Sequence, residues 1–396
     1  MRTAKNSEVS RILTYNEIDR EEWSRLVRES RTGTWFQTPE AHAFFATQKD
    51  VMEAFVVALQ AYPQPLPKGK GVEPTLNPSL KGRIEDRPIL RGVCVGYVTR
   101  ERNAIKQLFT RRAIINGGPA LANDATGEEV QALMEAVRKE LNGGPIYIET
   151  RNFNDYSPWK EAFEQAGFAY KRHLNFHIDC TDKAAMWGRL SERRRREIRK
   201  VSATASLNDA ARLPNEPQAG FLSDERDIRA WYAILEKLYR TKVKTPLWPL
   251  KFFIEAHRQG VARYLLVRHE GKVIGGIMVV SDEMSAAEPL NDAAKLPNAA
   301  CGTVYEWYIC GLDADYKDQY PSVMATWAAM EYANTHGLAR FDVMGAGEPG
   351  VPYGVRDFKA EFGGELVEQG RFIHIAKPLL YKIGETGVRL LKKISI

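Results

Sequence analysis

One short pattern occurs twice in the sequence, and the two copies lie half a chain apart. Trp159–Phe163 (WKEAF) and Phe358–Phe362 (FKAEF) both read aromatic-Lys-x-x-Phe. The lysines are 359 − 160 = 199 residues apart in a chain of 396 residues. Each copy lies between two short apolar stretches: 146–149 and 170–178 for the first, 340–344 and 365–375 for the second. Internal repetition predicts two copies of one strand–helix–strand domain, only one of which need carry the chemistry.

Length and periodicity support this division. A chain of this length exceeds one normal hydrophobic core, and two domains are expected. Apolar stretches typical of strands alternate with helical spacing, which predicts mixed α/β domains. The expected strands are 53–60, 92–99, 107–115, 262–268, 272–280 and 303–311, and the expected helices are 128–141, 227–239 and 321–336. We expect an N-terminal domain at 1–180, a C-terminal domain at 181–376 and a basic amphipathic segment at 377–396.

Three polar segments are expected insertions: 62–88, 205–220 and 283–300. The last two overlap the near-identical LNDAARLPN (207–215) and LNDAAKLPN (290–298), which differ at one position. Such near-identity within diverged halves does not fit the old duplication. We interpret them as low-complexity loop insertions without chemistry, with a paired recognition loop as the alternative.

Composition narrows the class of protein. The net charge of +6 allows an anionic partner without requiring one. The four cysteines form no C-x-x-C pair, so neither a zinc site nor a disulfide framework is expected, and we predict no metal or redox cofactor. No apolar run reaches the ~20 residues of a membrane-spanning helix. We therefore expect a cytoplasmic protein. Its segment 377–396 either lies on the inner membrane surface or docks on the second domain.

The order of the expected elements resembles the GNAT acetyltransferase fold. That resemblance implies a glycine-rich loop at the N-terminus of the central helix, where backbone N–H groups hold the pyrophosphate of acetyl-CoA. The corresponding segment, Asp313–Pro321 (DADYKDQYP), has no glycine, carries three aspartates and ends in a proline that lacks an N–H. The first-half counterpart, 116–127, has no G-x-G pattern next to its helix. The fold thus suggests acyl transfer, whereas this loop argues against acyl-CoA bound in the usual manner.

Tandem GNAT-like halves without that loop resemble the FemABX family. Four stretches carry the resemblance: Trp187–Lys200 (WGRLSERRRREIRK), Phe341–Gly347 (FDVMGAG), Tyr353–Gly364 (YGVRDFKAEFGG) and Trp35–Thr38 (WFQT). The resemblance implies an aminoacyl-tRNA-dependent transferase that attaches an amino acid to the peptide of a peptidoglycan precursor. The sequence departs from the family in three places. No Asp follows Gly118-Pro119 until Asp124, no Lys stands just after Gln37, and the second-domain coiled-coil arm is absent.

Lys359, next to Phe358, is the first candidate catalytic residue. The resemblance implies that this lysine stabilises developing negative charge or holds the tRNA acceptor end, and an ammonium suits either role. The alternative is a solvated helix lysine with aromatic residues packed beneath it, and Lys160 is expected to be such a lysine. Asp342 is either a buried residue that holds a turn, or a base or ligand of the substrate amine. Asp124 is a further candidate proton acceptor.

The segment 187–201 has an apolar stripe at helical spacing, and six cations lie within its residues 193–200, which predicts a helix packed on one side. A cationic face of this density is typical of a phosphate-binding site for tRNA or a lipid-linked pyrophosphate, and the alternative is a solvated charged helix. Arg195 and Arg199 share a face, as do Arg196 and Lys200. The candidate substrate-binding residues are Arg193, Arg195, Arg196, Arg199, Lys200, Arg356, Tyr353 and Gln37.

Three functions remain open at this level. The first is transfer of an amino acid from aminoacyl-tRNA to the stem peptide of a lipid-linked or nucleotide-linked peptidoglycan precursor. The second is acyl-CoA-dependent N-acylation of a cell-envelope polysaccharide or lipid precursor. The third is a non-catalytic tandem domain that binds glycolipid or RNA. Replacing Lys359 should inactivate either enzyme and leave simple binding largely intact.

Overall fold

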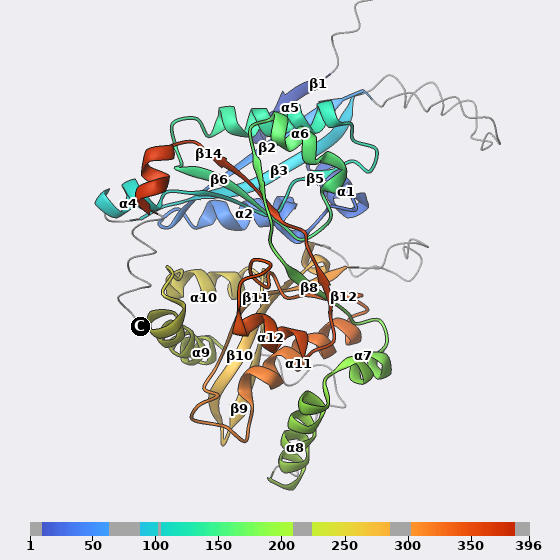
Figure 1. Cartoon of the computed structure of the whole chain (residues 1–396), viewed down its shortest axis with the longest axis vertical. Coiled ribbons are helices and arrows are strands. Elements are labelled where there is room, and N and C mark those ends of the chain that lie inside the picture. The colour runs from blue at the N-terminus through green and yellow to red at the C-terminus, as the bar shows by residue number, and fades with distance from the viewer. Residues whose placement is uncertain (1–9, 63–87, 102–103, 209–223, 286–301, 385–396) are drawn as a thin grey trace, which may run out of the picture. The chain divides into compact units, whose positions relative to one another are not determined.

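The structure, a computed structural model, describes residues 10–62, 88–101, 104–208, 224–285 and 302–384. The chain forms two compact units (Figure 1). The first contains residues 1–171 and 371–396, and the second contains residues 172–370. The chain therefore returns to the first unit at its C-terminal end.

The first unit contains an eight-stranded sheet with the order β1-β2-β3-β4-β6-β14-β7, and β5 also pairs with β3. Strands β4 and β6 run parallel, and the other pairs are antiparallel. The strands are β1 (Ser10–Leu13), β2 (Met52–Ala61), β3 (Ile89–Thr99), β4 (Ala113–Gly117), β5 (Ala120–Leu121), β6 (Tyr147–Asn152), β7 (Ala169–Lys171) and β14 (Arg371–Ile375).

Helices cover both faces of this sheet, with α5 and α6 on one face and α1 and α2 on the other (Figure 1). Helix α5 begins at a capping box, in which Thr126 and Glu129 each accept a hydrogen bond from the other's backbone N–H. The apolar residues of α5 that the sequence places at helical spacing are buried in the core. The helices are α1 (Arg20–Glu29), α2 (Pro39–Thr47), α4 (Ala104–Thr110), α5 (Gly127–Glu140) and α6 (Lys160–Gln165).

The second unit contains a six-stranded sheet with the order β13-β8-β12-β11-β10-β9. Helix α11 connects the parallel strands β11 and β12 and packs, with α12, over a core that includes Phe176, Ile178 and Phe341. The strands are β8 (Asn175–Asp179), β9 (Arg263–His269), β10 (Lys272–Ser281), β11 (Thr303–Gly311), β12 (Arg340–Asp342) and β13 (Glu365–Val367). The helices are α7 (Lys183–Arg189), α8 (Glu192–Asn208), α9 (Glu225–Leu238), α10 (Leu250–Arg258), α11 (Pro321–Thr335) and α12 (Gly354–Ala360).

The two sheets follow one plan. The order β2-β3-β4-β6-β14-β7 in the first unit matches β9-β10-β11-β12-β8-β13 in the second, with the same strand directions. Helices α5 and α11 occupy equivalent places, as do α6 and α12, which carry the two lysines of the repeated pattern. The predicted pair of tandem GNAT-like domains is confirmed.

The two units exchange one strand each. The expected strand 170–178 is two strands in different sheets, since β7 stays in the first unit and β8 joins the second. The expected strand 365–375 divides in the same way into β13 in the second unit and β14 in the first. Figure 1 shows this as a red β14 beside the teal β6 and a green β8 beside the red-orange β12. The structure therefore divides the chain after Lys171 and again after Gly370, whereas the predicted boundary lay at 180/181.

Other expectations need correction or lie outside the described residues. Residues 107–115, expected as one strand, form the end of α4 followed by β4. Residues 378–384 are helical and belong to the first unit, not the second, where the ring of Tyr381 packs edge-on against Tyr147 at 5.4 Å. The insertions 63–87, 209–223 and 286–301 and the segment 385–396 lie outside the described residues. Within the described part of the chain, no helix has the length and apolarity needed to cross a membrane.

Candidate functional site in the second unit

The parallel strands β11 and β12 separate after three residues. Thr303, Val304 and Tyr305 pair with β12, but β11 continues to Gly311 while β12 ends at Asp342. The equivalent pair in the first unit does not separate, because all five residues of β4 pair with β6. Among the described residues, the opening between the two parallel central strands is therefore a property of the second unit.

The side chain of Lys359 bridges the two diverging segments. Its Nζ lies 2.9 Å from Oε1 of Glu306 on β11, and it donates hydrogen bonds to the carbonyl oxygens of Val343 (2.6 Å) and Gly345 (3.0 Å) beyond β12. Lys359 and Glu306 are 8% and 7% exposed. Burial raises the pKa of Glu306, and the Lys359 ammonium opposes that rise. The expected alternative of a solvated lysine is wrong for Lys359.

All three N–H groups of this ammonium have acceptors. In this structure Lys359 holds the turn that follows β12, and a direct contact with a reacting oxyanion would require one of these bonds to be exchanged. The geometry therefore favours a positioning role for Lys359 over direct charge stabilisation. Phe358 lies partly buried beside it and packs on the core and on Phe362.

The first unit supplies a natural comparison for this ion pair. The strand register places Tyr305 opposite Asp342 and Ile114 opposite Glu149, so Glu306 corresponds to Ile115. Ile115 is fully buried in the apolar core. Lys160, the counterpart of Lys359, is half exposed and lies 3.9 Å from Glu164. Lys160 thus occupies the solvated position that the sequence predicted.

The turn after β12 is shaped by a second buried carboxylate. Asp342 is 0% exposed, and its Oδ1 accepts hydrogen bonds from the Asn175 side chain (2.8 Å) and the Met344 N–H (2.7 Å). Oδ1 of Asn175 in turn accepts a bond from the Gly345 N–H at 2.8 Å. These contacts hold Met344 at φ +52°, a left-handed conformation that a non-glycine residue adopts at a cost of about 1 kcal/mol or more. The predicted turn-holding role of Asp342 matches this geometry.

Asp342 also has a histidine neighbour that the sequence analysis did not single out. Nε2 of His177 on β8 lies 3.2 Å from Oδ2 of Asp342, within ion-pair distance, and both atoms are enclosed and form no hydrogen bond of good geometry within the described residues. Burial alone would raise the pKa of Asp342. The hydrogen bond and charge of His177, together with Arg340 and Asn175, outweigh burial and lower that pKa.

Arg356 contacts backbone rather than an open site. Its guanidinium donates to the carbonyl oxygens of Ala346 (2.7 Å), Val351 (3.1 Å) and Glu348. This fan of bonds closes the loop between β12 and α12. In this structure the predicted carboxylate or phosphate clamp is therefore occupied by internal acceptors. Tyr353, at the N-cap of α12, is 43% exposed and available to a ligand.

The arginine-rich helix α8 is confirmed, but the residue that points inward is one that the sequence analysis left out. Arg194 is 4% exposed and forms ion pairs with Glu197 (2.5 Å) and Glu361 (2.7 Å). Its guanidinium carbon also lies 4.6 Å from the ring centre of Phe358. Neither of the two pairs expected to share a face, Arg195 with Arg199 and Arg196 with Lys200, is buried, because Arg194, Glu197 and Ile198 form the packed face.

The remaining cations of α8 differ in their surroundings. Arg193 pairs with Glu197 at 2.9 Å, and Lys200 pairs with Asp318 at 2.6 Å. Arg195 donates to the Gly188 carbonyl, and Arg199 lies over the Trp187 ring. Arg196 is exposed, and no ion pair holds it within the described residues. An anion site on α8 stays a prediction, with Arg196 and Arg199 as its most accessible members.

The N-terminus of α11, where an acyl-CoA pyrophosphate would bind, already holds a carboxylate. Asp313 accepts hydrogen bonds from the Ser322 N–H (3.1 Å) and from the Ser322 hydroxyl (2.5 Å). Pro321 occupies the first turn and supplies no N–H. The equivalent helix of the first unit, α5, is closed by its own capping box.

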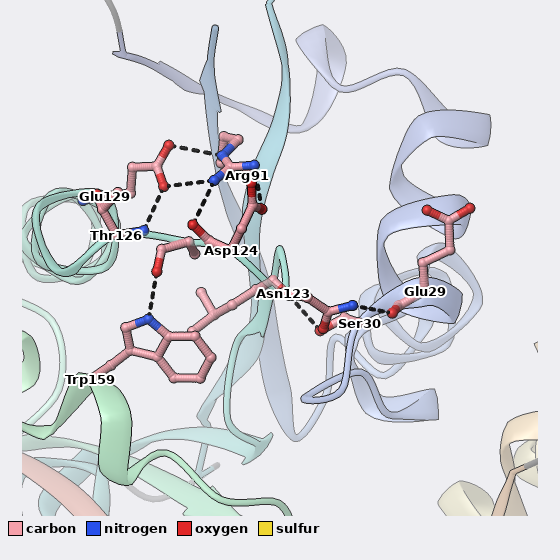
Figure 2. Close-up of polar contacts among 10 residues, drawn as sticks. Glu29, Ser30, Arg91, Asn123, Asp124, Thr126, Glu129 and Trp159 are labelled. Atoms are coloured by element: carbon pink, nitrogen blue, oxygen red, sulfur yellow. Dashed lines mark hydrogen bonds and ion pairs between the residues drawn. The ribbon is translucent and has the colours of Figure 1, made fainter. Parts of the chain in front are cut away.

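Gln37 and Asp124 lie in the first unit. Gln37 is 0% exposed, and its amide donates to the carbonyl oxygens of Val95 (3.0 Å) and Asn116 (2.9 Å) and accepts from the Val95 N–H. This environment gives Gln37 a structural role and leaves no N–H for a substrate. Asp124 pairs with the buried Arg91 at 2.8 Å, and Arg91 also pairs with Glu129 (Figure 2). The Asp124 carboxylate is thus already bound by the Arg91 guanidinium, and its role as a proton acceptor stays a prediction.

A cavity of about 350 Å³ lies in the first unit, at the C-terminal end of α5. Arg138, Lys139 and His374 are among its lining residues. Arg138 donates to the Ala166 carbonyl, so this cation serves the backbone of the first unit. None of the predicted site residues lines this cavity.

The comparisons with known proteins agree with the fold. The model of the FemAB family matches residues 296–387, which include Glu306, Asp342 and Lys359. A crystal structure of FemX superposes with a TM-score of 0.58 and 12% identity, covering 94% of this chain and 99% of that chain. A tandem GNAT protein from the clavulanic acid biosynthesis pathway gives a TM-score of 0.45 at 10% identity, covering 93% and 98%. Saccharomyces cerevisiae N-myristoyltransferase with bound myristoyl-CoA gives 0.45 at 11% identity, covering 95% and 80%. No curated protein matches the sequence.

Proposed function

We propose, from the assignment of this chain to the FemABX family, that it transfers an amino acid from aminoacyl-tRNA to the amine of a peptidoglycan-precursor stem peptide. The observation that carries the proposal is the opening between β11 and β12, with the buried Glu306–Lys359 pair at its base. The described residues of the first unit have neither this opening nor an equivalent ion pair. The second unit is therefore the catalytic unit in this proposal.

The edge of β11 that faces the opening can pair with the backbone of a peptide or acyl segment. Beyond Tyr305, no described strand pairs with β11 on the side of β12, so an extended acyl or peptide segment can pair with the edge of β11. The Lys359 ammonium fixes the carbonyl groups of Val343 and Gly345 that border this edge. A rigid border holds the ester carbon and the attacking nitrogen in register, which is how orientation lowers the barrier of acyl transfer.

The exposed cations of α8 are the proposed contact for the phosphates of the tRNA donor. Arg196 and Arg199 are exposed on α8. On the packed face of the same helix, Arg194 contacts Phe358 of α12 and Glu361 at the end of α12. An anion bound on α8 would therefore sit on the element that supports the catalytic turn. Tyr353, exposed at the start of α12, is the proposed contact for the acceptor or for the terminal nucleotide.

An acyl-CoA-dependent N-acyltransferase is the second candidate, and one observation weighs against it. In each unit the N-terminus of the central helix is already capped. Asp313 accepts the Ser322 N–H of α11, and the Thr126–Glu129 capping box closes α5. A pyrophosphate at α11 would have to displace an internal carboxylate of the same charge sign. We expect acyl-CoA to bind no more tightly than a nonspecific anion, as measured by calorimetric titration.

The direct test uses total tRNA charged with a mixture of ¹⁴C-labelled amino acids, and nucleotide-linked or lipid-linked peptidoglycan precursor as acceptor. Label should appear on the stem peptide and be abolished by ribonuclease treatment of the donor. Absence of transfer to either precursor from every charged tRNA would show that the proposal is wrong.

Lys359→Met and Lys160→Met form a matched pair of variants for this assay. Lys359→Met should reduce transfer by about 10²-fold or more, because the border of the opening loses its support, whereas Lys160→Met should retain it. A non-catalytic binding protein would show no transfer and equal RNA affinity for both variants.

A further inference from the structure

A second buried cluster flanks the same turn, and the proposed mechanism does not yet use it. His177 and Asp342 face each other across β8 and β12, at the point where β12 leaves β11. Phe176 and Ile178 point into the core under α11, so His177 lies on the opposite face of the sheet. Val343, whose carbonyl oxygen Lys359 holds, follows Asp342 directly. The lysine and the histidine thus meet the same turn from the two sides of the sheet.

The first unit has a buried carboxylate at the position equivalent to Asp342, and its partners show how a purely structural carboxylate is neutralised there. The register pairs Glu149 with Ile373 and Asp342 with His177, so Glu149 is the counterpart of Asp342. Glu149 is held by two guanidinium groups, from Arg371 at 2.8 Å and Arg151 at 3.0 Å. A buried carboxylate that only has to be neutralised is well served by two permanent cations.

The second unit has replaced both of those cations. Arg371 corresponds to Asn175 and Arg151 to Met344, while the apolar Ile373 corresponds to His177. The buried carboxylate of Asp342 is therefore paired with a neutral amide, a backbone N–H and an imidazole, a side chain that can both donate and accept a proton. This exchange of fixed charge for a titratable one sets the second unit apart.

The geometry also assigns the two ring nitrogens. Nε2 faces Asp342 and is fully enclosed, so it is the nitrogen that carries the proton in the neutral ring. With the proton on Nε2, Nδ1 is the ring nitrogen left to accept a second proton. The other charged groups around His177 are Glu365, its register partner on β13, Asp179 on β8 and Arg340 on β12.

We propose that His177 accepts the proton of the attacking amine during aminoacyl transfer, and that Asp342 is the positioning residue that orients it. The proposal rests on the proposed function. As the amine nitrogen bonds to the ester carbonyl carbon, its proton passes to Nδ1. The ester C–O bond then breaks, and the imidazolium returns the proton to the leaving ribose oxygen. The sum is amine plus ester to amide plus alcohol, without an oxidant or a second reactant.

The test is the pH dependence of transfer, measured with charged total tRNA and nucleotide-linked precursor between pH 5.5 and 9. For the wild type, the rate should fall toward acid as His177 becomes protonated. His177→Gln should lose about 10²–10⁴-fold in rate and lose that acidic limb. His173→Gln, a histidine near Gly345, should keep both the rate and the limb. Asp342→Asn should lower the rate and displace the limb, an effect that a structural role alone would not produce.

A companion variant addresses loss of folding. His177→Ala should regain activity when imidazole is added, in proportion to the concentration of neutral imidazole. A His177→Gln protein that keeps the wild-type rate and pH profile would overturn the inference while leaving the transferase proposal intact. An inactive wild type would instead refute the transferase proposal itself.

Discussion

Replacing Lys359 by Met tests whether the second unit depends for its stability on the buried Lys359–Glu306 ion pair, which has no counterpart among the described residues of the first unit. The change leaves the Glu306 carboxylate buried without its cation and the Val343 and Gly345 carbonyl groups without their donor. Breaking one side of a buried ion pair costs about 3–5 kcal/mol. For a unit of this size that corresponds to a fall in Tm of about 6–20 °C.

The dependence on pH has a definite sign. Burial already raises the pKa of Glu306, and removal of Lys359 takes away the interaction that opposes this rise. A carboxyl whose folded pKa is raised favours folding below its unfolded pKa and loses that contribution as pH rises through the folded value. The destabilisation of Lys359→Met should therefore be small near pH 4 and grow toward pH 8.

The first unit suggests the compensating variant. Glu306→Ile combined with Lys359→Met reproduces its pairing of a buried isoleucine with no inward lysine. Replacing both charges by apolar groups is often neutral or stabilising, so most of the lost free energy should return while transfer activity stays absent. Calorimetry and urea unfolding of both variants, with Lys160→Met as control, measure this. A single variant no less stable than Lys160→Met, or a double variant without recovery, would refute the reasoning.

Three further predictions concern residues around the two buried carboxylates and α8. Burial would raise the pKa of Glu149, but Arg151 and Arg371 lower this pKa to about 2. The ionised Glu149 carboxylate therefore stabilises the fold above its unfolded pKa, and this contribution is lost as the pH falls toward 2. Glu149→Gln should cost at most about 3 kcal/mol at pH 7 and flatten the acid unfolding curve; an unchanged curve would contradict this. Arg194→Met should cost about 3–5 kcal/mol in urea unfolding, whereas Arg196→Met should cost under about 0.5 kcal/mol yet weaken tRNA binding and reduce its salt dependence. Equal stability losses would show that Arg194 is not the packed residue. Gly345→Ala should cost about 1–3 kcal/mol by thermal unfolding, because Gly345 has φ +127° and a Cβ would lie 3.2 Å from His173, and a neutral result would show that the turn can relax.

Much of each unit is predictable because its signals are local. The helical spacing at 128–141 reflects one buried face, whereas Pro321 and Gly337 delimit the helix expected at 321–336, and the structure has α5 and α11 there. The repeated aromatic-Lys-x-x-Phe pattern predicted two equivalent units, and it predicted a solvated Lys160. The lack of glycine and the three aspartates before Pro321 predicted a poor environment for a pyrophosphate, and in the structure Asp313 accepts the Ser322 N–H at this helix N-terminus.

The strand exchange was beyond the reach of periodicity. The stretches 170–178 and 365–375 each continue an apolar pattern across the point where the chain leaves one sheet for the other. The polar run Lys171-Arg172-His173 and the pair Gln369-Gly370 mark these crossings in the sequence. Such breaks also occur in ordinary turns, so they carry no information about which sheet receives the next strand.

The sequence by itself predicted two α/β units and several of their helices. It also singled out Lys359 as a lysine that differs in role from Lys160, its counterpart in the other unit. Only the tertiary structure decided what that lysine, and the buried carboxylate near it, would meet. Glu306 lies 53 residues from Lys359 along the chain, and His177 and Asn175 lie 165 and 167 residues from Asp342. Side-chain periodicity reports which face of an element is buried, whereas strand order and register set the partner across it. Each such pairing contributes to stability because the partners are buried, and an unpaired charge in the core costs several kcal/mol.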